Sequence, residues 1–193
     1  MRCRVKPLRV YLAGPDVFFP DALEVGARKK VICSEYGFEG VFPLDAELDL
    51  AGLSPPEQGH RCFDAMIDLM EGCDFAIANL TPFRGPSMDV GTAVEIGYMH
   101  GRGKPVFGYT NVATSYAERV DPDRFLIEPF DLVDNLMVEG PIHSSGVQVI
   151  RSSVPSEQMY ASLDGFIACV AQAADFFRQT GARARTPRES TKR

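Results

Sequence analysis

The 193-residue sequence lacks several features that would assign it to a common class of protein. No apolar run is long enough to cross a bilayer, and the first residues lack the apolar core of a signal peptide, so no membrane association is expected. Positive charge is not in excess, because the net charge is −6. This balance argues against binding to a nucleic-acid polymer, but nucleic-acid monomers remain possible substrates.

Signals for metal and disulfide sites are also missing. The cysteines are scattered and odd in number, and none forms a C-x-x-C pair, so we predict reduced thiols in a cytoplasmic protein. The histidines have no metal-ligand spacing, so no metal site is predicted. The sequence contains no G-x-G-x-x-G, P-loop or G-x-S-x-G motif, which removes the signatures of dinucleotide binding, P-loop phosphate binding and the α/β-hydrolase nucleophile.

The composition is that of a globular chain, with 45% hydrophobic and 24% charged residues, and it predicts a single domain over residues 1–180. Residues 181–193 are strongly basic and almost free of apolar side chains, so a disordered tail is predicted there.

Strands and helices are expected to alternate along the domain. Apolar runs predict strands at residues 8–13, 41–44, 75–80 and 105–109, and helical spacing predicts helices at 21–36, 60–73, 89–100 and 159–179. Residues 139–155 have the Gly, Pro, Ser and Val spacing of a loop or hairpin. This alternation predicts a parallel sheet covered on both faces.

The most informative segment is residues 73–98, in which an apolar strand enters a loop rich in Pro and Gly and then a helix. Asp89 stands at the start of that helix and Glu95 on its body. Ligands of α/β proteins bind at such strand-to-helix turns, and paired carboxylates there suit glycosyl chemistry. The alternatives are a solvated Glu95 and an Asp89 that only caps the helix.

Together with Tyr11-Leu-Ala-Gly-Pro15 and Gly103-Lys-Pro-Val-Phe-Gly-Tyr109, this segment resembles the nucleoside 2-deoxyribosyltransferase family. The resemblance covers roughly residues 8–137. It implies an α/β fold with a flavodoxin-like, doubly wound parallel sheet. It also implies that 2-deoxyribose is exchanged between free nucleobases and nucleosides in a cytoplasmic salvage reaction, with retention and without a cofactor.

The resemblance also implies roles for individual residues. Glu95 would attack the sugar, Asp89 would bind it, and Tyr11 would hold Glu95 ionised and aimed. The segment Asn135-Leu-Met137 resembles one that a neighbouring subunit inserts into the site, so Asn135 and Met137 predict a homo-oligomer with shared sites. From the residues alone, Tyr11 is equally a β-prone core residue and Asn135 a turn signal.

Other positions complete the predicted site. The resemblance implies that an acid or amide on the helix before residue 73 contacts the nucleobase and assists its protonation. Asp68 is preferred for this role to Asp64, which shares its helix face. Gly14 belongs to the resembling turn after the first strand. Phe18 is a candidate for stacking on the base, against the alternative of core packing, and Arg84 for contacting a substrate phosphate.

Two other functions stay open at this stage. The first is a nucleoside 5′-monophosphate N-glycosidase, for which Arg84 and Ser87 are the only phosphate-binding candidates in the loop. The second is a non-catalytic nucleotide-sensing domain, because a fold does not fix a function.

Overall fold

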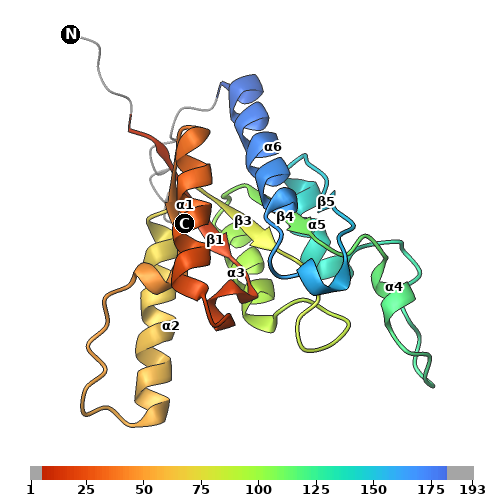
Figure 1. Ribbon diagram of the computed structural model, residues 1–193, viewed down its shortest axis with the longest axis horizontal. Coiled ribbons are helices and arrows are strands. Elements are labelled where there is room, and N and C mark those ends of the chain that lie inside the picture. The colour runs from red at the N-terminus through yellow and green to blue at the C-terminus, as the bar shows by residue number, and fades with distance from the viewer. Residues whose placement is uncertain (1–5, 182–193) are drawn as a thin grey trace, which may run out of the picture.

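The computed structural model describes residues 6–181 of the chain, and these residues form one layered domain (Figure 1). The strands are β1 (Leu8–Ala13), β2 (Phe38–Val41), β3 (Phe75–Asn79), β4 (Val106–Thr110) and β5 (Ile150–Arg151). The helices are α1 (Ala22–Glu35), α2 (Pro55–Glu71), α3 (Val90–Gly101), α4 (Tyr116–Arg119), α5 (Leu136–Ser144) and α6 (Asp164–Thr180).

The strands form a parallel sheet in the order β2-β1-β3-β4-β5. This is the flavodoxin-like order, so the predicted fold class is confirmed. Every residue of β3 and β4 is buried, as expected for central strands that are covered by helices on both faces. In Figure 1 the segment that carries α4 projects away from this layered body.

The two faces of the sheet carry different side chains. The small-residue face packs against α2, α3 and α5, and its strand residues are Tyr11, Ala13, Ala76, Ala78, Val106 and Gly108. The aromatic face packs against α1 and α6, and its strand residues are Val10, Leu12, Phe75, Ile77, Phe107 and Tyr109. A Cβ atom at Gly108 would lie 2.5 Å from Ile142 Cδ1, so the glycine is required for the close approach of α5.

Two predicted boundaries in the first half of the chain were wrong. The second strand spans Phe38–Val41 instead of 41–44, because Gly37 ends the preceding turn with a φ of 84° and Pro43 starts a 3-10 turn, Pro43–Asp45. The helix predicted at 60–73 begins at Pro55. Ser54 and Glu57 form a capping box around its first turn, a signal that is visible in the sequence.

The predictions for the second half need two corrections. Residues 139–155 are not a hairpin, because they contain most of α5 and the parallel edge strand β5. Gly140 and Pro141 disfavour a helix, but Pro141 and Ile142 are buried in the core, and this packing overrides propensity. The last helix begins at Asp164 rather than 159, because the Asn111 side chain binds the carbonyls of Met159 and Ser162.

The predictions for the tail, for membrane-spanning segments and for the cysteines can be compared with the structure only for residues 6–181. The predicted basic tail, apart from Gly181, lies outside the described residues. No helix within residues 6–181 is both long and apolar enough to cross a membrane. The cysteines of this range, Cys33, Cys62, Cys73 and Cys169, are all free thiols.

Candidate active site

The candidate site lies where β1 and β3 end, side by side in the centre of the sheet. The chain leaves β1 toward α1 on the aromatic face and leaves β3 toward α3 on the small-residue face. Strands whose connections diverge in this way open a crevice at their carboxyl ends, and flavodoxin-like sheets bind ligands at this β1/β3 switch point.

Tyr11 and Glu95 form the central pair of the site. The Tyr11 side chain is fully buried on β1, and its hydroxyl donates a 2.6 Å hydrogen bond to Glu95 Oε1. Glu95 lies on α3 and is half-buried, so the residue combines a fixed hydrogen-bond partner with partial exposure to solvent. The structure therefore brings together the predicted nucleophile and the tyrosine predicted to hold it.

The surroundings of Glu95 raise its pKa, so the carboxyl group titrates near neutral pH. Burial is the largest cause and raises the pKa of Glu95 from 4.5 to about 7. The hydrogen bond from Tyr11 lowers this pKa, and the negative charge of Asp89 raises it further. Burial, followed by the charge of Glu95, raises the pKa of Tyr11 well above its usual range, so the phenol stays a neutral donor.

Asp89 caps the helix that carries Glu95. Its Oδ2 accepts hydrogen bonds from the Thr92 backbone N–H at 3.0 Å and from Thr92 Oγ1 at 3.1 Å. The capping role is therefore present in the structure, whereas no contact in the described protein occupies Oδ1. Because its charge acts on Glu95, Asp89 belongs to the same electrostatic group.

Gly14 directly follows β1, in the turn that leads to α1. A Cβ atom there would lie 2.5 Å from Asp16 Oδ2 and 2.8 Å from the Asn79 Cβ atom. Asp16 is buried, and it binds Lys29 Nζ at 2.8 Å. Glycine is thus required because the turn folds back against the end of β3.

An aromatic surface extends from this turn to the loop after β3. The rings of Phe18 and Phe83 are stacked, with centroids 5.5 Å apart and planes 11° from parallel. The Arg84 guanidinium lies over both rings, 5.2 Å from the Phe18 centroid and 4.8 Å from the Phe83 centroid. Phe18 is 53% exposed and Arg84 is exposed, so this surface is open to a flat ligand.

Arg84 also adopts a backbone conformation that is uncommon for a residue with a side chain, with a φ of 59°. Such left-handed residues cluster at ligand-binding turns. Phe83 was not among the predicted site residues, although the sequence places it in the loop after the strand and next to Arg84.

Asn135 and Met137 lie at the start of α5. Asn135 caps this helix, because its Oδ1 accepts a hydrogen bond from the Met137 N–H at 2.9 Å, and its Nδ2 donates to Glu128 Oε1 at 2.6 Å. The Met137 side chain is 72% exposed. No contact joins either residue to Glu95 within the described chain, and their predicted role at a neighbour's site stays a prediction.

Asp68 is not brought into contact with the central pair. Its side chain is exposed on α2, and its charge acts on Tyr98 rather than on Glu95. Met66 of the same helix instead reaches the pair, with its Sδ 3.6 Å from the Tyr11 hydroxyl oxygen. Two residues correspond to a turn of about 200° around a helix, so Asp68 lies on the opposite side of α2 from Met66.

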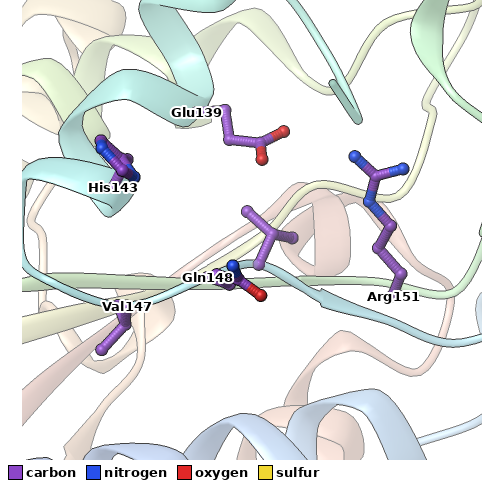
Figure 2. Close-up of a pocket in the computed structure, with 6 residues that line it drawn as sticks. Glu139, His143, Val147, Gln148 and Arg151 are labelled. Atoms are coloured by element: carbon purple, nitrogen blue, oxygen red, sulfur yellow. The ribbon is translucent and has the colours of Figure 1, made fainter. Parts of the chain in front are cut away.

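A separate cavity of about 420 Å³ lies between α5 and β5. It is lined by Glu139, His143, Val147, Gln148, Val149 and Arg151, and in Figure 2 Glu139 and Arg151 point toward one another across it. None of the predicted site residues lines it. Within residues 6–181, no three His, Cys, Asp or Glu side chains are grouped closely enough to hold a metal ion.

Comparison with known proteins identifies the family. A profile described as nucleoside 2-deoxyribosyltransferase matches residues 10–137. The chain belongs to this family. The matched range contains every predicted site residue, from Tyr11 to Met137.

Individual proteins resemble this chain in sequence or in structure. A 2-desoxiribosyltransferase from Leishmania mexicana superposes with a TM-score of 0.66 at 26% identity, covering 88% of this chain and 98% of that one. An uncharacterized protein of Schizosaccharomyces pombe is 35% identical over 164 residues, covering 71% of this chain and 78% of that protein. A conserved protein from Enterococcus faecalis V583 shares the fold, with a TM-score of 0.53 at 20% identity.

Proposed function

We propose that this protein transfers 2-deoxyribose between nucleobases and that Glu95 is the covalent nucleophile. The observation that carries the proposal is the 2.6 Å hydrogen bond from Tyr11 to the half-buried Glu95 at the β1/β3 switch point. A carboxylate suits this task, because the reacting sugar carbon acquires oxocarbenium character and accepts an oxygen nucleophile.

The first step breaks the bond between the sugar and its base. Tyr11 holds Glu95 Oε1, which leaves Oε2 to attack C1′ while the electron pair of the C1′–N bond leaves with the base. The base gains a proton as it departs. In the second step a nitrogen of the incoming base attacks C1′ and loses its proton, which balances the proton gained by the first base, and the bond from C1′ to Glu95 breaks with its electron pair returning to the carboxylate. Two inversions give net retention.

Other site residues bind the substrate in this proposal. Asp89 Oδ2 is engaged by Thr92, so Oδ1 is the oxygen proposed to accept a hydrogen bond from a sugar hydroxyl. The exposed face formed by Phe18 and Arg84 is proposed to hold the base, because stacking on rings and guanidinium planes tolerates different bases. Asp68 as the proton donor to the base stays a prediction for which the structure provides no contact.

The competing hydrolase of nucleoside 5′-monophosphates is disfavoured by the loop after β3. Of its two candidate phosphate ligands, Ser87 already donates its hydroxyl to Asp134 Oδ1 at 2.6 Å. A buried carboxylate beside that hydroxyl would repel a phosphate. Arg84 alone supplies few donors for a phosphate, since phosphate sites present several donors from different residues.

Product chromatography tests the proposed reaction. Deoxyadenosine, adenosine and deoxyadenosine monophosphate are each incubated with hypoxanthine as the acceptor base. We expect deoxyinosine and free adenine from deoxyadenosine, with adenosine a weaker donor. Release of sugar phosphate from the monophosphate without base exchange would replace the transferase by the hydrolase. Binding without turnover of any donor would favour the nucleotide-sensing domain.

The active unit is proposed to be a homo-oligomer in which Asn135 and Met137 complete a neighbour's site. The segment around them exposes a set of large apolar side chains that a second copy could cover: Phe125, Leu126, Phe130, Leu136 and Met137. Figure 1 shows the chain between β4 and α5 projecting from the domain, as an exchanged segment requires.

Complementation tests the shared site. Glu95→Ala and Asn135→Ala variants are each expected to be inactive, and mixing them should restore about a quarter of wild-type activity if pairs of sites are shared across a two-fold axis. A fully active monomer in light scattering would rule out the shared site.

A further inference from the structure

Asp134 is a buried acid for which the proposed reaction has no use. It lies in the connection between β4 and α5 and is only 1% exposed. No lysine or arginine within residues 6–181 forms an ion pair with it. Burying a carboxylate costs free energy of folding unless hydrogen bonds satisfy its oxygens. The donors to Asp134 therefore show which segments of the chain it connects.

Three donors surround the Asp134 carboxylate, and we call this group the Asp134 clamp. The Ser87 hydroxyl donates to Oδ1 at 2.6 Å, and the Met88 backbone N–H donates to Oδ2 at 2.7 Å. The Asn135 backbone N–H donates to Oδ1 at 2.8 Å. The carboxylate thus joins the loop before α3 to the residue that caps α5.

Arg119 strengthens the same junction from α4. Its Nε donates to the Pro86 carbonyl at 3.0 Å, and its Nη2 donates to the Val133 carbonyl. The loop before α3 is therefore tied to the 133–135 segment on both sides of the clamp. Asp89 follows Met88 directly, so its position depends on the backbone that Asp134 holds.

We propose that Asp134 is a positioning residue, which fixes the loop before α3 so that Asp89 presents its free oxygen to a sugar hydroxyl. This inference rests on the proposed function for the identity of the sugar ligand. Asp134 itself does not touch the substrate in this proposal. It acts through the Met88 N–H and the Ser87 hydroxyl, which donate to different oxygens of the Asp134 carboxylate, so both oxygens are needed as acceptors.

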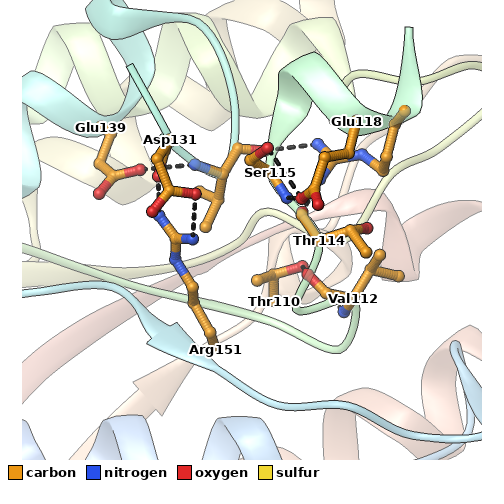
Figure 3. Close-up of polar contacts among 10 residues, drawn as sticks. Thr110, Val112, Thr114, Ser115, Glu118, Asp131, Glu139 and Arg151 are labelled. Carbon is orange, nitrogen blue, oxygen red and sulfur yellow. Dashed lines mark hydrogen bonds and ion pairs between the residues drawn. The ribbon is translucent and has the colours of Figure 1, made fainter. Parts of the chain in front are cut away.

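The main test compares Asp134→Asn with a matched control, Glu139→Gln. Glu139 anchors the residue on the other side of Asp134, because its Oε2 accepts a hydrogen bond from the Val133 N–H at 2.8 Å (Figure 3). Within residues 6–181, no hydrogen bond or ion pair joins its side chain to the loop before α3. Both variants replace an acid by its amide in the same segment, but only Asp134→Asn replaces one of the two oxygens that accept from Ser87 and Met88 by an NH2 group, which cannot accept.

The expected result separates binding of the sugar from general damage. Asp134→Asn should raise KM for deoxyadenosine by about 10- to 100-fold, the scale of a lost hydrogen bond to a charged group, with a smaller change in kcat. The wild-type protein should prefer deoxyadenosine to the dideoxy analogues that lack the 3′ or the 5′ hydroxyl. Asp134→Asn should lose this preference. Adding Asp134→Asn to Asp89→Asn should then cost little more. Glu139→Gln should keep both the KM and the preference.

Hydrogen exchange supplies a readout that needs no activity. Deuterium uptake over residues 83–90 should rise in Asp134→Asn and stay at the wild-type level in Glu139→Gln. If Asp134→Asn does not fold, Ser87→Ala removes one clamp bond and should show the same changes at smaller size. The role of Asp134 would be overturned if Asp134→Asn left deuterium uptake in this loop unchanged, or if its KM and kcat equalled those of Glu139→Gln.

Failure of the proposed function would look different. In that case the wild-type protein would exchange no bases with any nucleoside, and the sugar-positioning role would fall with it. Amide hydrogen exchange would still show whether Asp134 holds the loop before α3 in place.

Discussion

The two faces of the sheet each bury one strand tyrosine, but the partners of these tyrosines differ in kind. On the small-residue face, Tyr11 binds Glu95, a half-buried carboxylate with no cation paired to it among residues 6–181. On the aromatic face, Tyr109 accepts a 3.0 Å hydrogen bond from Lys29, which is paired with Asp16 at 2.8 Å.

The two acids near these tyrosines therefore differ, because Asp16 is neutralised by a lysine and Glu95 is not paired with a cation within residues 6–181. Lys29 and Asp16 neutralise each other, and their side chains are only 2% and 4% exposed, so a substrate has no access to them. Glu95 has no such cation within residues 6–181 and is only half-buried. We infer that the aromatic face stabilises the turn after β1, whereas the small-residue face carries the chemistry.

The largest expected effect is the loss of activity in Glu95→Gln. Removing a covalent nucleophile costs about 10⁴-fold or more in kcat, so the variant should show almost no base exchange. Circular dichroism should show wild-type helix content, because the amide keeps the volume of the side chain. A variant with more than a few per cent of wild-type activity would contradict the comparison of the two faces.

The next largest effect is on stability and belongs to the aromatic face. Lys29→Met leaves Asp16 buried without its cation, and breaking one partner of a buried pair costs about 3–5 kcal/mol of the free energy of unfolding. Urea unfolding measures this loss. Lys30→Met is the matched control, since Lys30 forms a partly exposed pair with Asp45 and should cost at most about 1 kcal/mol.

Tyr11→Phe is expected to have an intermediate effect on catalysis. It removes one hydrogen bond to a charged group, so kcat/KM should fall about 10- to 100-fold at neutral pH. The wild-type profile should rise as pH increases through about 7, because Glu95 must be ionised. Since the Tyr11 bond lowers the pKa of Glu95, this rise should move to higher pH in Tyr11→Phe. An unmoved profile would show that Tyr11 does not tune Glu95.

The smallest effect concerns the stability cost of an ionised Glu95. Its pKa is raised from 4.5 to about 7 on folding, so the unfolded chain loses this proton at lower pH than the folded one. The contribution of Glu95 to the free energy of unfolding is fully present below pH 4.5 and is lost as the pH rises through about 7. Glu95→Gln should therefore gain thermal stability relative to wild type across this window.

Glu57→Gln provides the control of opposite sign for this measurement. The side chain of Ser54 lowers the pKa of the exposed Glu57, so removing that carboxylate should slightly destabilise the protein above pH 4.5. Equal pH dependence of the melting temperatures in both variants would contradict the assignment of the raised pKa to Glu95.

The sequence was sufficient to predict the three central strands of the parallel sheet, β1, β3 and β4, whereas the edge strand β5 was missed and the bounds of β2 were wrong. The β3–α3 segment combines an apolar strand, a Pro-Gly loop and an acid at the helix start, and each of these local signals agrees with the final fold. The start of α2 could also have been predicted, because Ser54 and Glu57 stand at capping-box spacing.

Long-range contacts decided what the sequence could not predict. The Asn111 side chain reaches across 48 and 51 residues to bind the carbonyls before α6, which delays that helix to Asp164. Met66 reaches Tyr11 across 55 residues. The Asp134 clamp joins residues 46 and 47 positions apart, and no local pattern marks such pairs.

Covalent trapping tests the central claim about Glu95 most directly. A 2-fluoro-arabinosyl nucleoside should form the glycosyl-enzyme and break it down slowly, because fluorine at C2′ destabilises the oxocarbenium-like transition state. Proteolysis and mass spectrometry should then find the mass of one fluorinated sugar on the peptide that contains Glu95, and none in Glu95→Gln. A sugar adduct on another residue, or base exchange by wild type without any adduct on Glu95, would contradict the claim.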